Sequence, residues 1–308
     1  MKARRLAAAV LLLTLAAGAR ASAPGQEPFN FLFLDAGARP AAMGGAYTAL
    51  ADDSNALLYN PGALGMEKRT EATFMYNEYV QTISQEYVGF AARNGFGFNL
   101  NSLDFGSVPR TTYNSPAGAG DSTGLDDLAV TAGYGHKILD SLSAGVAVKY
   151  IRESIDASSA RAFALDAGIL YKAPFAQGLS LGAAVQNVGE PVTFVTSKEY
   201  LPLNVRAGAG YDFKILGRDN TVSLDLTKER SQAVLVAVGL ESRMIDVLPL
   251  RLGFSTSNDA GPGITAGFGY VFGRGSFDYA IAPYGDLGLT NRISVTWRFG
   301  SAEPKPGS

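Results

Sequence analysis

The sequence contains no cysteine. This absence excludes a disulfide framework, thiolate chemistry and lipid attachment through a cysteine. Histidine occurs once, at His136, which we expect to be an interfacial or lumenal residue. With no second histidine for the serines, a nucleophilic triad is improbable, and we expect no enzyme activity. Neither charge sign dominates, since the formal net charge is −2, so no basic field indicates nucleic-acid binding.

The sequence also lacks a long hydrophobic run beyond its start. Residues 1–21 carry Lys2, Arg4 and Arg5, then an apolar stretch, then small residues. This is the layout of a secretory signal peptide, and we expect cleavage after residue 21 or as late as residue 23. No later segment offers the 18 or so apolar residues of a membrane-spanning helix. The mature chain is therefore expected to be exported.

The chain is rich in apolar residues and in glycine. Hydrophobic residues make up 47% of the sequence, charged residues 18%, and glycine 36 of 308 positions. An exported, glycine-rich, apolar chain without a membrane helix fits two classes, a soluble all-β protein or an outer-membrane barrel.

A two-residue period dominates from Thr70 onward. The segment "NRISVTWRF" places Ile293, Val295, Trp297 and Phe299 on one face and polar residues on the other. Fourteen such segments follow one another, most near the length that a tilted strand needs to cross a bilayer. They are 69–80, 84–93, 96–104, 126–137, 142–152, 161–172, 179–188, 203–214, 221–228, 232–243, 249–256, 263–272, 276–282 and 291–299.

The connections sort by parity. Those after even-numbered strands are short, whereas those after odd-numbered strands include the long segments 105–125, 189–202 and 283–290. Bacterial outer-membrane barrels have short periplasmic turns and longer outer loops. The pattern therefore favours the barrel over a soluble domain and places both termini at the periplasmic rim.

The polar face of these strands is rich in glycine and carries isolated charges. We predict that these charges face the lumen and pair with each other or with a segment inside it, because unpaired buried charges are costly. They are Asp166, Arg206, Asp225, Arg251 and Asp278. The sequence thus predicts an all-β fold, a 14-stranded antiparallel transmembrane β-barrel over 69–299, followed by a periplasmic tail over 300–308.

Residues 22–68 lack the two-residue period and are too few to form a core of their own. We call this segment the hatch, and we expect it to pack inside the lumen. "MGGAYTALA" and "DSNALLY" predict two short helices, with Asp52 and Asp53 near the cap of the second. Asn60 and Pro61 begin a turn signal that ends it.

The stretch "DAGARPAAMGGAYTALADDSNALLYNPGALG" resembles the PorV/PorQ branch of the FadL-type outer-membrane proteins. The resemblance implies a 14-stranded barrel with an amino-terminal hatch, and by position it assigns six residues to the hatch motif: Gly44, Gly45, Asp52, Asp53, Asn60 and Pro61. One departure is visible, because the family's N-P-A-G-L is Asn60-Pro61-Gly62-Ala63-Leu64 here.

Three functions remain open at this point. The first is binding or passage of hydrophobic small molecules across the bacterial outer membrane. Its candidate ligand residues are Met43, Tyr47, Leu50, Leu57, Leu58 and Tyr59. The second, implied by the resemblance to PorV, is a component of type IX secretion that holds exported protein cargo on its long loops. The third is a sealed structural barrel. We expect the protein to contact outer-membrane lipid and to be a monomer. We expect it to bind no cofactor or metal.

Overall fold

The computed structural model describes residues 28–300, apart from residues 112, 117, 119–121, 157, 195, 196 and 231. The expected signal peptide and residues 301–308 of the expected tail lie outside the described residues.

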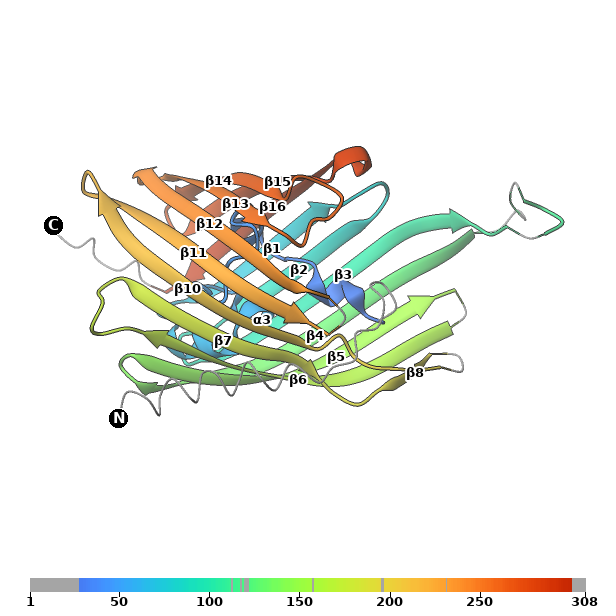
Figure 1. Cartoon of the computed structure of the whole chain (residues 1–308), viewed down its shortest axis with the longest axis horizontal. Helices are drawn as coiled ribbons and strands as arrows, with labels where there is room; N and C mark the ends of the chain where they lie inside the picture. Colours follow the sequence, from blue (N-terminus) through green and yellow to red (C-terminus); the bar gives the residue numbers. More distant parts are fainter. Residues whose placement is uncertain are drawn as a thin grey trace.

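Fourteen antiparallel strands form a closed barrel, which confirms the predicted fold class (Figure 1). Each strand pairs with its neighbours along the chain, and β1 closes the barrel against β16, with Thr70 opposite Phe299. The strands are β1 (Thr70–Glu78), β2 (Ser84–Ala91), β3 (Phe96–Pro109), β4 (Ser122–Leu139), β5 (Leu142–Ile155), β6 (Ser158–Lys172), β7 (Leu179–Val188), β10 (Asn204–Ile215), β11 (Arg218–Glu229), β12 (Val234–Ile245), β13 (Leu248–Ser255), β14 (Ile264–Phe272), β15 (Gly275–Pro283) and β16 (Leu289–Phe299).

The residues that alternate between apolar and polar in the sequence also alternate between exposed and buried in the structure. On β16, Ile293, Val295 and Trp297 face outward and are exposed, whereas the residues between them are buried. Large apolar side chains are exposed in this way on strands all around the barrel. Such a continuous outward apolar face requires hydrocarbon around it, because water would make it costly. None of the helices in the described part of the chain is long and apolar enough to span a membrane.

Two of the expected loops contain strand. β3 and β4 continue past the rest of the sheet, so residues 105–109 and 122–124 of segment 105–125 form a two-stranded arm that projects from the barrel (Figure 1). The segment 189–202 contains a separate hairpin, β8 (Val192–Phe194) and β9 (Ser197–Glu199). Both were expected to be loops because neither has a sustained apolar alternation. Each is held by pairing between its own two strands, and the hairpin also packs on β6, with Val192 against the apolar cluster of the lumen.

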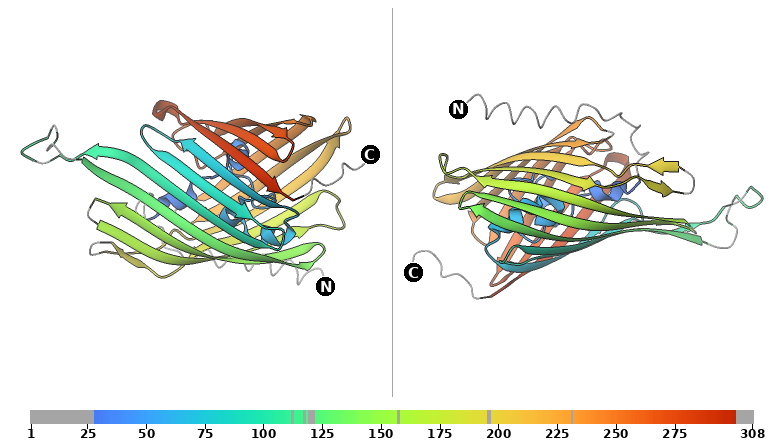
Figure 2. Two further views of the ribbon diagram at one scale, coloured as in Figure 1. Left: turned by 180° about the vertical axis from the view of Figure 1, so that it is seen from behind. Right: turned by 90° about the horizontal axis from the view of Figure 1, so that it is seen from below.

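The described part of the hatch, residues 28–68, lies inside the barrel (Figure 2). Its elements are η2 (Asn30–Phe33), α2 (Ala38–Ala42), α3 (Ala56–Tyr59) and η3 (Pro61–Met66); a further short helix, η4 (Gly285–Leu287), lies between β15 and β16. The predicted second helix is present as α3. The predicted first helix over 43–51 is wrong: α2 ends before it, because Gly44 and Gly45 adopt positive φ angles of 66° and 77° that a helix cannot continue.

The hatch runs from one end of the barrel to the other. Phe29 lies at the long-loop end, where its backbone N–H donates to Glu153 at 2.6 Å. The chain then descends to Thr70, at the short-turn end, where β1 begins. The described chain thus begins at the long-loop end, and the expected amino terminus of the mature chain, at residue 22, lies outside the described residues.

Candidate functional site: the lumen and its hatch

A single wall carboxylate anchors the middle of the hatch. Asp225 on β11 accepts hydrogen bonds from the backbone N–H groups of Tyr47 and Thr48, at 3.1 and 2.9 Å, and from the Thr48 hydroxyl at 2.5 Å. Arg206 on β10 lies 3.4 Å from the same carboxylate and also donates to the carbonyl of Gly45 at 2.8 Å. The pair thus holds a bend of the hatch that is not helical.

A second anchor lies at the end of α3. The Asn60 side chain donates to the carbonyls of Thr48 and Ile169, both at 2.9 Å, and accepts from the Gly62 N–H at 3.0 Å. It thereby joins the hatch to β6 and caps η3. An added Cβ on Gly62 would lie 2.6 Å from the carbonyl oxygen of Gly168 in the wall. The position that departs from the family motif is therefore one where only glycine fits.

Glycines on both sides bring the hatch backbone against the wall. On one side, η3 packs on inward-facing glycines of β4, β5 and β6, and Gly145 meets the carbonyl of Pro61. On the other, a Cβ on Gly44 would lie 2.7 Å from the carbonyl oxygen of Phe254, and one on Gly253 of β13 would collide with the Gly44 nitrogen. The glycine-rich lumenal face of the strands is explained by this close approach.

At the long-loop end, the start of the hatch packs on the wall in an apolar cluster. The segment around η2 contributes Phe29, Phe31 and Leu32 to a buried cluster with inward-facing wall residues such as Leu103 and Ile151. Beside this cluster is a small cavity of about 50 Å³, lined by Leu34, Leu58 and Tyr59 of the hatch and by polar residues that include Arg206 and Glu229 of the wall.

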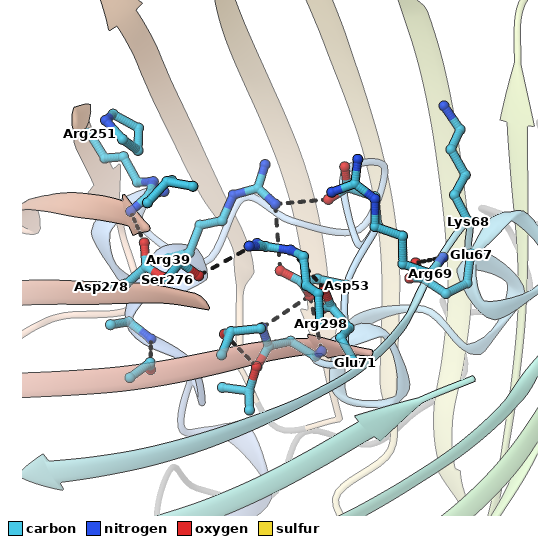
Figure 3. A pocket seen from close by; sticks show the side chains of 18 of the residues that line it. Arg39, Asp53, Glu67, Lys68, Arg69, Glu71, Arg251, Ser276, Asp278 and Arg298 are labelled. Carbon is cyan, nitrogen blue, oxygen red and sulfur yellow. Dashed lines mark hydrogen bonds and ion pairs between the residues drawn. The ribbon is translucent and has the colours of Figure 1, made fainter. Parts of the chain in front are cut away.

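At the short-turn end, the lumen is ionic. Two cavities of about 330 and 630 Å³ open below the hatch, and Arg39 lines both. Its guanidinium lies 2.8 Å from Asp52, 3.5 Å from Asp53 and 2.9 Å from Glu241 on β12. Figure 3 shows Arg39 and Asp53 converging on the smaller cavity with Arg298 and Glu71 of the wall.

Burial perturbs the titration of the hatch groups here. It raises the pKa of Asp53, and the positive charge of Arg39 opposes that rise. Burial also raises the pKa of the Tyr47 hydroxyl well above its usual value; this hydroxyl donates to Asp53 at 2.5 Å. The pKa of Glu67 is raised to about 8 by burial, and its Oε2 has no hydrogen-bond partner among the described residues.

The candidate ligand residues of the hatch do not form one surface. Met43, Tyr47 and Leu57 are fully buried against the wall or each other. Leu58 and Tyr59 line the cavity at the long-loop end, whereas Leu50 lines the larger cavity at the other end. The structure therefore separates this set by the hatch itself, and a ligand role stays a prediction.

Each of the five lumenal charges has an ionic partner. Asp166 lies 3.1 Å from Lys149, and Arg206 pairs with Asp225. Arg251 bridges Glu241 and Asp278, at 2.7 and 2.6 Å. Asp52 and Asp53 pair with Arg39, and Asp53 also accepts from the Asn55 N–H at 2.9 Å just before α3.

Sequence reasoning missed several residues of this arrangement. The apolar start of the hatch, "FNFLFL", was not singled out, although its run of aromatic and leucine residues marks it as buried. Arg39 and its wall partner Glu241 were also missed. The inward parity of β12 identifies Glu241 as lumenal, but only the path of the hatch brings Arg39 to it. In the part of the chain that the structure describes, no three acidic or histidine side chains gather as a metal site.

The model of the Uncharacterised protein family UPF0164 matches residues 6–159, half of the chain, so the chain belongs to this family. No curated protein matches the sequence.

Solved structures show the same fold at low identity. The CymD monoaromatic hydrocarbon channel is 12% identical with a TM-score of 0.60, over 86% of this chain and 98% of that one. The Pseudomonas putida toluene transporter TodX is 13% identical with a TM-score of 0.57, over 87% and 99%. A Pseudomonas aeruginosa FadL homologue is 12% identical with a TM-score of 0.51, over 83% and 96%. The barrel with its internal hatch is thus similar in fold to FadL-type channels.

Proposed function

We propose that the protein lies in the bacterial outer membrane and binds hydrophobic small molecules beside the long-loop end of its hatch, for passage across that membrane. The observation that carries this proposal is the apolar cluster of Phe29, Phe31 and Leu32 inside the lumen at the long-loop end. A porin for polar solutes has a polar interior. The fold neighbours support the proposal, since those named above include a monoaromatic hydrocarbon channel and a toluene transporter.

The route is closed in the observed state. Hatch backbone packs directly on wall backbone, and Asp225 and Asn60 fasten the bend between them. A solute that binds at the long-loop end therefore passes only when part of the hatch moves. This closed packing is also what a sealed structural barrel would show, and planar-bilayer recordings separate the two, because a sealed barrel gives no conductance steps.

Binding of a hydrophobic fluorescent probe tests the proposal. Leu34→Asn combined with Leu58→Asn places two amides at the cavity beside the hatch, and Leu216→Asn, on the exposed turn between β10 and β11, is the matched control. We expect wild type and control to bind N-phenyl-1-naphthylamine alike, and the double variant to bind at least tenfold more weakly, because one buried leucine alone contributes roughly 1.5–3 kcal/mol and tenfold corresponds to about 1.4 kcal/mol. Equal binding by all three forms, or binding by none, contradicts the proposal.

The alternative, a PorV-like component that holds exported protein cargo, rests on the projecting arm. β3 and β4 pair only with each other beyond Asp104 and Leu125, and Tyr113 near the tip is fully exposed. Deleting residues 108–122 removes the arm without touching the lumen. Under this alternative, the deletion leaves the barrel folded and abolishes co-purification of exported proteins; unchanged co-purification contradicts it.

A further inference from the structure

The small cavity at the long-loop end is lined by apolar and by polar residues. Leu32 belongs to the apolar cluster and Leu34 packs against it, and both also line the cavity. The polar residues of the lining include Asp35 of the hatch, together with Asn204 and Glu229, which lie opposite each other on β10 and β11. The cavity can therefore hold a polar group next to an apolar one.

A relay of hydrogen bonds fixes the orientation of the Asn204 amide. The Gln186 Nε2 donates to the carbonyl of Leu58 at 2.8 Å, and a carbonyl can only accept. The Gln186 Oε1 must then be the acceptor of the next bond, and the Asn204 Nδ2 donates to it at 3.2 Å. The Asn204 Oδ1 is left without a hydrogen-bond partner among the described residues, although Asn204 is only 5% exposed. A buried acceptor in the lining of a cavity is costly unless a donor binds it.

The Asp35 carboxylate is a second acceptor in the lining. Its Oδ1 accepts from the Tyr59 hydroxyl at 2.9 Å, so the hydrogen of that hydroxyl points to Asp35. In the part of the chain that the structure describes, no ammonium or guanidinium nitrogen lies within ion-pair distance of Asp35. A carboxylate inside the lumen without an opposite charge is costly, and a bound cation would offset that cost.

Arg206 is the only basic residue among the described residues that line the cavity. Its Nη2 donates to the Gly45 carbonyl at 2.8 Å and lies 3.4 Å from the Asp225 carboxylate. Because the charge of Arg206 is matched by Asp225, the charge of Asp35 remains uncompensated in the lining. The cavity therefore favours a positively charged group over a negatively charged one.

The size of the cavity restricts what can enter it. Its volume is about 50 Å³, whereas a cavity of about 150 Å³ holds benzene and one water molecule takes about 30 Å³. An ammonium group, which is close to water in size, fits, and an aromatic ring does not. A group inside so small a cavity lies within reach of both Asp35 and Asn204.

We propose that Asp35 and Asn204 bind the cationic head of a hydrophobic amine, so that the protein selects amines over carboxylates. The ammonium donates to the Asp35 carboxylate and to the Asn204 Oδ1, and the hydrocarbon part packs on Leu32 and Leu34. This inference rests on the proposed function, because it names the class of hydrophobic molecule bound beside the hatch. A carboxylate ligand is rejected, because like charges repel and the Asn204 Oδ1 cannot donate.

Competition with N-phenyl-1-naphthylamine tests this assignment in the purified full-length protein. The competitors are octylamine, octanol and octanoate, which share one chain length and differ in charge, and ammonium chloride as a free cation. Octylamine is protonated at neutral pH, as lysine is. We expect it to displace the probe at concentrations about tenfold lower than octanol, the low end of what one hydrogen bond to a charged group provides. Octanoate is expected to be no better than octanol.

A charge-removing variant assigns the preference to the cavity. Asp35→Asn keeps an acceptor for the Tyr59 hydroxyl and removes the charge. We expect it to bring octylamine to the level of octanol while displacement by octanol is unchanged, and Asp35→Glu to keep part of the preference. Asp286→Asn, at an exposed position of the same end of the barrel, is the matched control. Partition of the competitors into detergent micelles is the same for every form, so it cancels when the variants are compared.

The outcomes separate this assignment from the proposed function. Equal displacement by octylamine and octanol in wild type, a preference for octanoate, or an intact amine preference in Asp35→Asn overturns the assignment, while displacement by octanol still supports the proposed function. Displacement by none of the three overturns both. Ammonium chloride that displaces the probe as well as octylamine does identifies a free cation as the ligand and rejects the amine. Heat-dependent migration on electrophoresis verifies that each variant is a folded barrel.

Discussion

The position of Asp225 was predictable from the sequence, but its contacts were not. Its place on the inward face of β11 follows from the two-residue alternation, and so does the inward place of Arg206 on β10. The alternation does not reveal that Asp225 mainly accepts bonds from the hatch backbone at Tyr47 and Thr48. That contact depends on a bend created by two glycines with positive φ, and a linear pattern carries no information on where the bend lies.

Replacing Asp225 with asparagine tests the anchor. The amide offers one acceptor oxygen where the carboxylate accepts three bonds from the hatch and faces Arg206. We expect Asp225→Asn to lower the stability of the packed hatch by about 2–4 kcal/mol, because it leaves a buried guanidinium and buried donors without a full partner. Proteolysis within residues 43–54 measures the loss. Asp219→Asn, exposed on the same strand, is the control, and equal protection of both variants contradicts the anchor role.

Glu67 makes the hatch sensitive to pH. Burial raises its folded-state pKa from 4.5 to about 8, so the folded protein binds the proton more tightly than the unfolded chain does. The contribution of Glu67 to the free energy of unfolding is then fully present below about pH 4.5 and falls as the pH rises toward 8. We expect a loss on the order of 2 kcal/mol from pH 5 to pH 9, because Glu67 is partly solvated. Glu67→Gln should lose less stability than wild type across this range in thermal unfolding, although not none, because the pKa of Asp53 is raised as well; the exposed control Glu190→Gln should keep the wild-type slope.

At the scale of elements, the strands were predictable and the hatch was not. Hydrocarbon outside and a packed lumen inside require apolar and polar residues to alternate, so the pattern occurs in the sequence of every strand of the barrel. The hatch elements are too short for a periodic signal, and α2 ends just before Gly44, which lies against the wall, and Gly45, both with positive φ. Asn60, by contrast, was predictable as a stop, because its side chain caps η3 through a local bond to Gly62.

The contact of η3 with the wall gives an element-scale prediction. A Cβ at Gly145 would collide with the Pro61 carbonyl, and backbone on both sides leaves no flexible group to yield. We expect Gly145→Ala to destabilise the closed hatch by about 1–3 kcal/mol through overpacking. Gly124→Ala, on β4 with nothing within 4 Å, should change stability by less than about 0.5 kcal/mol. Hydrogen exchange of the amides of residues 61–66 compares the two variants. Matching protection factors would show that η3 does not pack tightly against Gly145.

At the scale of the whole molecule, the loop parity in the sequence gives the direction of the barrel but not its contents. Long and short connections alternate as expected, and the added arm and hairpin both lie at the long-loop end. The division of the lumen into an apolar cluster at one end and ionic cavities at the other was not foreseen. It arises because the hatch threads the full length of the barrel, from Phe29 to Met66, and turns different side chains to each end.

The absence of cysteine makes the orientation of the molecule directly measurable. Tyr113 on the arm and Leu216 on the turn between β10 and β11 are nearly fully exposed at opposite ends of the barrel, so single cysteines there differ only in which compartment they face. With long loops outside, a membrane-impermeant maleimide should label Tyr113→Cys on intact cells, and Leu216→Cys only after the outer membrane is permeabilised. Labelling of Leu216→Cys alone on intact cells would mean an inverted barrel. Labelling of both would mean that no membrane encloses the outward apolar face of the barrel. The hatch would then not separate two compartments.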